Sequence, residues 1–222
     1  MIKSDTIERV ILTATCFADA DESIDIALIL ARHLKADMDA YLLQDEAMLL
    51  ASQLPYSRAT SLSGKSSKVT RSIMQEAFFE DAKSYQQALS QAASKDHVTW
   101  TFQQVEGTAD KILTVARTKE TLALFGFQRL HKPKNEILII APKISQQMTK
   151  LASLLSVKMK THVEPLVVNG PEELRNLVIM LQKKSPALII ISDQIVREVG
   201  IGRIIDAGRC PIIVHAKMIN GE

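Results

Sequence analysis

The stretch ALIIIS, residues 187–192, decides the fold, because five apolar side chains follow one another without a polar residue between them. A strand with one wet face alternates apolar and polar residues, so a continuously apolar strand predicts a parallel sheet covered on both faces. Helical apolar spacing precedes it at residues 171–184 and follows it at residues 194–207, where Gly208 is predicted to end the helix. Strand and helix therefore alternate around this stretch, as in an α/β protein.

The same alternation extends to both ends of the chain. Strands are predicted at residues 10–14, 38–43, 98–105, 121–125, 136–141, 163–168, 187–192 and 211–215. Helical segments separate them, and the right-handed crossover rule makes the fold α/β with a doubly wound, mainly parallel sheet. The polar stretch QRLHKPKN, residues 128–135, is the best linker candidate. It predicts two related halves, residues 1–130 and 131–222, that form either one continuous eight-stranded sheet or two sheets.

Composition excludes several classes of protein. The chain has 222 residues, a net charge of +2 and two cysteines at opposite ends, Cys16 and Cys210. The near-neutral charge gives no general attraction to nucleic acid, and we expect no nucleic-acid partner. No apolar run approaches the length of a membrane span, and the N-terminus does not have the pattern of a signal peptide, so we expect a cytoplasmic protein without a membrane partner. No metal-ligand spacing is intact, and we expect no metal.

Both ends of the chain resemble one known family. The opening RVILTATCFADADESIDIALILARHLKADMDAYLL is similar to the first β-α-β unit of the universal stress protein family. The end, ALIIISDQIVREVGIGRIIDAGRCPIIVHA, is similar to its closing β-α-β unit, with Cys210-Pro211 where that family commonly opens its last strand. The resemblance implies the adenine nucleotide alpha hydrolase-like fold, in a divergent tandem or fused bacterial member with a stress-related role. It also implies a homodimer formed through the sheet edge of the last strand, residues 211–215.

The resemblance implies a degenerate nucleotide site. Binding members carry Gly-x-x-Gly, about nine residues and then Gly-Ser or Gly-Thr after the fourth strand, whereas this chain has Gly126 alone in the first half. The glycines of the second half lack that spacing. The candidate ligand-binding residues are therefore Thr15, Cys16, Gly126, Gly200, Gly202, Arg203 and Gly208. The alternative is a purely structural role, in which each glycine forms a turn or a helix end and Cys16 is a half-buried, inert thiol.

A second phosphate-binding candidate is ATSLSGKSSK, residues 59–68, which differs from a P-loop by Ala59 in place of the first glycine. A P-loop needs a strand directly before it and a helix directly after it, and Pro55 argues against that strand. We expect an exposed loop over residues 55–68. The acidic end of the apolar stretch, Asp193, imitates a Mg²⁺-binding carboxylate but is common at parallel strand ends.

The sequence thus predicts a non-catalytic, stress-related regulatory protein that acts by binding a partner or a small ligand, with no cofactor. Two alternatives stay open. One is a protein that binds ATP or AMP, at Thr15, Cys16 and Gly126 or at the glycine segment 200–208. The other is a thiol-based redox sensor at Cys16, because a helix N-terminus lowers the pKa of a thiol, although the neighbouring acidic residues oppose this effect.

Overall fold

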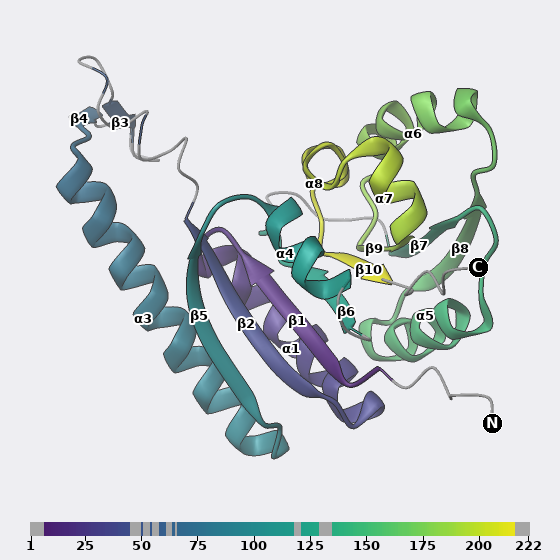
Figure 1. Ribbon diagram of the computed structural model, residues 1–222, viewed down its shortest axis with the longest axis horizontal. Helices are drawn as coiled ribbons and strands as arrows, with labels where there is room; N and C mark the ends of the chain where they lie inside the picture. The colour runs from purple at the N-terminus through teal and green to yellow at the C-terminus, as the bar shows by residue number, and fades with distance from the viewer. Residues whose placement is uncertain are drawn as a thin grey trace.

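The computed structural model (Figure 1) describes residues 7–44, 50, 54, 58–60, 64, 66–117, 121–128 and 135–215. Its main feature is one continuous eight-stranded sheet, in the order β5-β2-β1-β6-β10-β9-β7-β8. The strands are β1 Arg9–Ala14, β2 Asp37–Gln44, β5 Trp100–Glu106, β6 Thr121–Phe125, β7 Glu136–Ala141, β8 His162–Val167, β9 Leu188–Ser192 and β10 Ile212–His215. The prediction of a mainly parallel sheet is confirmed, and of the two arrangements left open the single sheet is observed.

Helices cover both faces of this sheet, which confirms the doubly wound α/β class. One face packs against α1 Phe17–Leu34, α3 Arg71–Asp96 and α5 Gln146–Met159. The other face packs against α4 Ala109–Arg117, α6 Pro171–Lys184, α7 Asp193–Val199 and α8 Ile201–Gly208. Successive strand side chains point to opposite faces, so Leu12 lies in the first core and Ile11 in the second. Among the helices of the described residues, none is long and apolar enough to cross a membrane.

The pairing of β6 with β10 divides the sheet into two oppositely directed sets of strands. Every other neighbouring pair in the sheet is parallel, whereas Ile212 of β10 lies opposite Phe125 of β6 in an antiparallel pair. The carboxyl ends of β1, β2, β5 and β6 therefore lie at one edge, and those of β7, β8, β9 and β10 at the other. The prediction that residues 211–215 form the edge of the sheet is wrong, because β10 is enclosed by β6 and β9.

The segment that resembles a P-loop has a different local structure. Its described residues form an antiparallel hairpin, β3 Arg58–Thr60 with β4 Ser66–Lys68, rather than a strand, loop and helix. The following helix α3 begins only at Arg71, after its N-cap Thr70. The P-loop alternative is therefore wrong, because β4 stands where the phosphate-binding helix would begin. The predicted exposed loop is corrected to a short exposed hairpin.

The helix predicted at residues 194–207 is two helices. Gly200 has φ = +91°, which ends α7 and begins α8, because a helix cannot continue through that conformation. Gly208 is the last residue of α8, and Arg209, at φ = +46°, is its left-handed cap. The role predicted for Gly208 is therefore wrong. A Cβ atom at Gly208 would lie 2.7 Å from Ile189 Cδ1, so glycine here permits close packing of α8 on β9.

Candidate functional site

Three of the predicted site residues come together where β1 and β6 end. Thr15 and Cys16 link β1 to α1, and Cys16 is the N-cap of that helix. Gly126 directly follows β6, and its N–H donates to the Thr13 carbonyl at 2.7 Å. The N-terminus of α1 therefore faces the end of β6, as expected for a ligand site at the carboxyl edge of a parallel sheet.

The carboxylate of Asp19 lies between the N-terminus of α1 and the segment that follows β6. Thr15 Oγ1 donates to Asp19 Oδ2 at 2.6 Å, and the backbone N–H of Gln128 donates to Asp19 Oδ1 at 2.8 Å. Both carboxylate oxygens are thus engaged, one on each side of the gap between α1 and the segment after β6. Two donors of this turn, Thr15 Oγ1 and the Gln128 N–H, therefore bind a carboxylate of the chain itself.

A second carboxylate, Asp81 of α3, lies at the same helix N-terminus. Burial raises the pKa of Asp81, the backbone N–H of Phe17 lowers it, and the negative charge of Asp19 raises it further. A helix N-terminus attracts anions through its free N–H groups and its dipole. Here the chain supplies two anions of its own, which disfavours a phosphate at the same place.

The space at Gly126 is filled by α1. A Cβ atom at this position would lie 2.5 Å from the Asp19 backbone oxygen and 3.2 Å from Ser23 Oγ. Glycine is required because the backbone after β6 packs directly on the first turn of α1. This contact places Gly126 against the first turn of α1, close to Thr15 and Cys16.

Cys16 is half-buried and is a free thiol. Burial is the main cause that raises the pKa of Cys16, and the backbone N–H of Asp19 partly opposes it, while the charges of Asp19 and Asp81 raise the pKa further. The thiolate fraction at neutral pH is thus below that of an ordinary cysteine, which reduces its nucleophilic reactivity. Cys210 is fully buried in the core, just before β10, the last described strand.

The remaining predicted residues lie on the opposite face of the sheet. Gly200, Gly202, Arg203 and Gly208 belong to α8 or to its N-cap, and α8 packs on the face that α1 does not cover. A Cβ atom at Gly202 would meet nothing within 4 Å, and Arg203 is exposed. The structure therefore does not combine these residues with Thr15, Cys16 and Gly126 in one site.

A buried carboxylate marks the carboxyl end of β9. Asp193 is 5% exposed and forms ion pairs with two arginines, Arg117 of α4 at 2.7 Å and Arg197 of α7 at 2.7 Å. Two guanidinium groups satisfy the Asp193 carboxylate, which is the arrangement expected of a structural ion pair. Asp193 therefore resembles a Mg²⁺ ligand in the sequence only, because in the structure its carboxylate binds two arginines. Within the parts of the chain described here, no group of three or more His, Cys, Asp or Glu side chains is placed to hold a metal.

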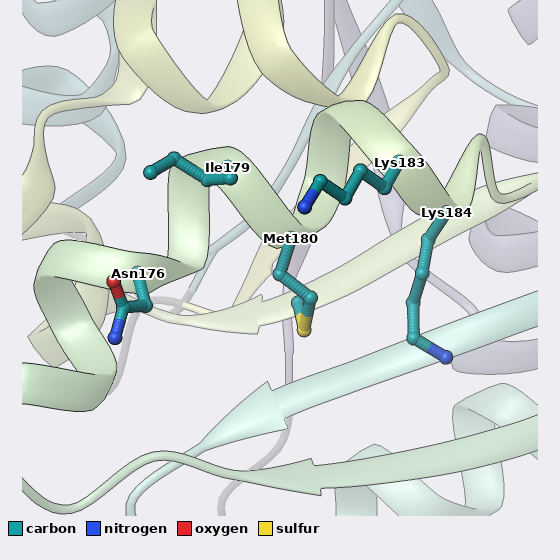
Figure 2. A pocket seen from close by; sticks show the side chains of 5 residues that line it. All are labelled: Asn176, Ile179, Met180, Lys183 and Lys184. Atoms are coloured by element: carbon teal, nitrogen blue, oxygen red, sulfur yellow. The ribbon is translucent and has the colours of Figure 1, made fainter.

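A cavity of about 380 Å³ lies on α6, away from all of these residues. Figure 2 shows its lining side chains on successive turns of the helix: Asn176, Ile179, Met180, Lys183 and Lys184. Lys184 Nζ is held by Glu164 of β8 at 2.6 Å. None of the predicted site residues lines this cavity.

The sequence did not predict the residues that contact Cys16 and Asp19 at the end of β1, or the arginine that pairs with Asp193 at the end of β9. Asp81 lies 65 positions after Cys16, and Arg117 lies 76 positions before Asp193, so no local pattern connects either pair. Gln128 acts through its backbone N–H, which any residue other than proline would supply. Among these residues, only Asp19 was recognisable from the sequence, because acidic residues are favoured in the first turn of a helix.

No family model matches this chain, and no curated protein matches it. Among solved structures, it is similar to a protein of the universal stress protein family from Burkholderia pseudomallei, with 12% identity over 96% of this chain and 98% of that chain and a TM-score of 0.33. It is also similar to a universal stress protein from Archaeoglobus fulgidus, with 9% identity over 96% and 97% of the two chains and a TM-score of 0.43. Both superpose loosely.

Proposed function

We propose that this chain is a non-catalytic regulatory protein of the universal stress protein type, which acts by binding a partner or a small ligand and has a degenerate nucleotide site. The observation that carries this proposal is the double engagement of Asp19, by Thr15 Oγ1 and by the backbone N–H of Gln128. The sequence resemblance of both ends of the chain supports the type of protein.

Electrostatics supports a closed site. Two carboxylates, Asp19 and Asp81, lie at the N-terminus of α1, and a nucleotide phosphate there would meet their like charge. The exposed cation Arg203 is on the other face of the sheet and is not available to neutralise that phosphate. Neither Cys16 nor Cys210 is in a disulfide, which is the state expected in the cytoplasm, where we propose that the protein acts.

The test is calorimetric titration of the purified chain with ATP and with AMP, each with and without Mg²⁺, together with mass spectrometry of co-purifying small molecules. We expect no binding in the micromolar range and no retained nucleotide. Micromolar affinity or a co-purified adenine nucleotide contradicts the closed site and favours the ATP- or AMP-binding alternative.

A matched pair of variants tests the reason for the closure. Asp19→Asn removes the charge and keeps an oxygen that accepts from Gln128, whereas Asp206→Asn removes an exposed charge from α8. We expect Asp19→Asn alone to raise the affinity for ATP, by roughly threefold to tenfold, because a charge near an anion is worth about 1 kcal/mol at a partly exposed site. Equal affinities in both variants would show that charge at α1 does not exclude the nucleotide.

A further inference from the structure

The two outer strands of the sheet, β5 and β8, differ in how their free edges are protected. Each pairs with one neighbour only, β5 with β2 and β8 with β7. An outer strand presents backbone N–H and C=O groups that can pair with another chain, and natural proteins block such edges with proline, charge or a covering segment. The two edges can therefore be compared residue by residue.

The β8 edge is blocked. His162 N–H donates to the Asn135 carbonyl and Val168 N–H to the Ala141 carbonyl, so the even-numbered residues of β8 bond to β7 and the odd-numbered residues point outward. Pro165, at the centre of the strand, is one of the outward residues and has no N–H to donate. The ion pair between Glu164 and Lys184 adds charge beside it.

The β5 edge is open. The Met38 N–H donates to the Thr99 carbonyl and the Gly107 N–H to the Gln44 carbonyl, so the odd-numbered residues face β2. The outward residues are Trp100, Phe102, Gln104 and Glu106, and all four keep an N–H and a C=O. Of the carbonyls, that of Glu106 accepts from Lys111 Nζ of α4 at 2.9 Å. No described strand pairs with this side of β5. The strand contains no proline, glycine or lysine, and Lys111 of α4 reaches it at the Glu106 end, so the centre of the edge lacks the usual protections.

The surface around the centre of this edge is also uncharged, whereas Lys111 of α4 lies at its Glu106 end. In β5, Glu106 is the single charged residue, and it stands at the end of the strand. The neighbouring helix α3, which contacts β5 through an edge-to-face pair of Tyr85 and Phe102 rings at 5.3 Å, has no charged residue from 84 to 94. Its exposed side chains there are Gln86, Gln87, Ser90, Gln91 and Ser94. An exposed helix face normally carries charges.

The charge of the surface around β5 indicates which kind of partner can pair with this edge. A twofold interface brings each surface against itself, so any net charge in the patch would be repelled by its own copy. The uncharged centre of β5, beside the uncharged residues 84–94 of α3, meets no such repulsion, and it offers no attraction to a charged partner. A second copy of this chain therefore fits the edge better than an acidic or basic protein does.

We infer that the outer edge of β5 pairs with β5 of a second copy, antiparallel, with Gln103 on the twofold axis. In that register Phe102 lies opposite Gln104 and Trp100 opposite Glu106, and each of these pairs has its N–H and C=O groups directed outward. Such residues form the hydrogen-bonded pairs of an antiparallel ladder. The Glu106 carbonyl would accept from the copy as well as from Lys111 Nζ. The two sheets become one continuous sheet, and no like charges lie opposite each other. This surface is separate from the α1 N-terminus, so the pairing does not depend on whether a nucleotide binds.

The test is the mass in solution of the full chain, measured by light scattering after size exclusion over a range of concentrations. We expect twice the 24.6 kDa chain mass for the wild type. Gln104→Pro removes an outward donor and no bond to β2, so we expect the mass of a single chain with an unchanged thermal unfolding temperature. Gln104→Thr keeps the N–H and serves as the matched control that remains a dimer.

A charge exchange tests the register without proline. Gln103 is exposed, and in the dimer it faces its own copy in a non-hydrogen-bonded pair, where side chains are closest. We expect Gln103→Lys and Gln103→Glu each to be monomeric, and an equal mixture of the two to recover the dimer mass. A wild type that is monomeric at every concentration overturns the inference. A dimer that persists in Gln104→Pro, or a mixture that fails to re-form the dimer, overturns it as well.

Discussion

The helices α1 and α7 each follow a strand, with at most two residues between, and carry an aspartate in the first turn, and they satisfy that aspartate differently. At α1, neutral donors hold Asp19: a threonine hydroxyl and a backbone N–H. At α7, two arginines hold Asp193, and Ser192 caps the helix. The same acidic signal in the sequence therefore forms a local turn in one half and a buried ion-pair centre in the other. In both cases a carboxylate in the first turn of the helix is bound by groups of the chain itself.

The largest difference is expected when each aspartate is removed. Asp193→Ala leaves Arg117 and Arg197 without their shared partner, and we expect a loss of about 3 kcal/mol in the free energy of unfolding, since breaking a buried ion pair costs about 3–5 kcal/mol and these arginines are partly exposed. Asp19→Ala removes two hydrogen bonds at an exposed turn, and we expect a loss of about 1 kcal/mol. Urea unfolding of both variants measures the difference. Equal losses of stability would contradict the view that Asp193 is the centre of a buried ion pair and Asp19 part of a local turn.

The glycines of the two regions provide the next test. Gly126→Ala places a Cβ atom 2.5 Å from a backbone oxygen of Asp19, which cannot move without shifting α1. We expect a loss of about 2 kcal/mol, in the range of overpacked sites. Thermal unfolding should show a lower midpoint, by roughly 4–8 °C for a chain of this size. An unchanged midpoint would mean that the contact between α1 and the end of β6 is loose.

Gly202→Ala should have the opposite sign. Gly202 lies in the first turn of α8 with no atom within 4 Å of a Cβ position, and its φ is not in the left-handed region. Alanine favours a helix over glycine by up to about 1 kcal/mol, so we expect a small gain in the free energy of unfolding. A loss of stability in this variant would show that Gly202, like Gly126, is required by its surroundings.

The smallest expected effect concerns Asp81 and pH. Burial and the charge of Asp19 raise its folded-state pKa above the usual 3.8, so the native state binds more protons than the unfolded state between those two values. This group therefore lowers stability as pH rises through its folded-state pKa. Asp81→Asn should be slightly more stable than the wild type at pH 7, by a few tenths of a kcal/mol, because it keeps an acceptor for Phe17 without the charge.

The measurement is the difference in thermal midpoint between Asp81→Asn and the wild type, from pH 7 down to pH 3. That difference should shrink on acidification, since protonated Asp81 resembles asparagine. A difference that grows at low pH would show that the carboxylate of Asp81 stabilises the fold and that the α1 N-terminus attracts anions more strongly than Asp19 repels them.

Periodicity predicted the strands and helices well, because each depends on side chains within one segment. The apolar stretch at residues 187–192 is β9, buried on both faces as expected. The position of β10 was not predictable in this way. Crossover rules apply to consecutive parallel strands, and nothing local in residues 211–215 specifies an antiparallel partner at Phe125.

Site residues were predictable only where the pattern was local. Thr15 and Cys16 follow a predicted strand, so their place at the edge of the sheet was expected, and Gly126 joins them because β6 pairs with β1. Apolar spacing alone suggested one helix across Gly200, since that spacing continues on both sides of the break. The backbone conformation of that residue depends on packing that a single sequence does not contain.

The place of β10 inside the sheet has a consequence for synthesis on the ribosome. β6 is complete at Phe125, but its partner strand is made last, at residues 212–215. At a usual elongation rate, the intervening stretch of about 90 residues takes on the order of 10 s to translate. During that interval one edge of the apolar strand TLALF can pair with β1, whereas its other edge, which β10 later covers, is exposed. A chaperone bound to the emerging chain would protect it until the last strand closes the sheet.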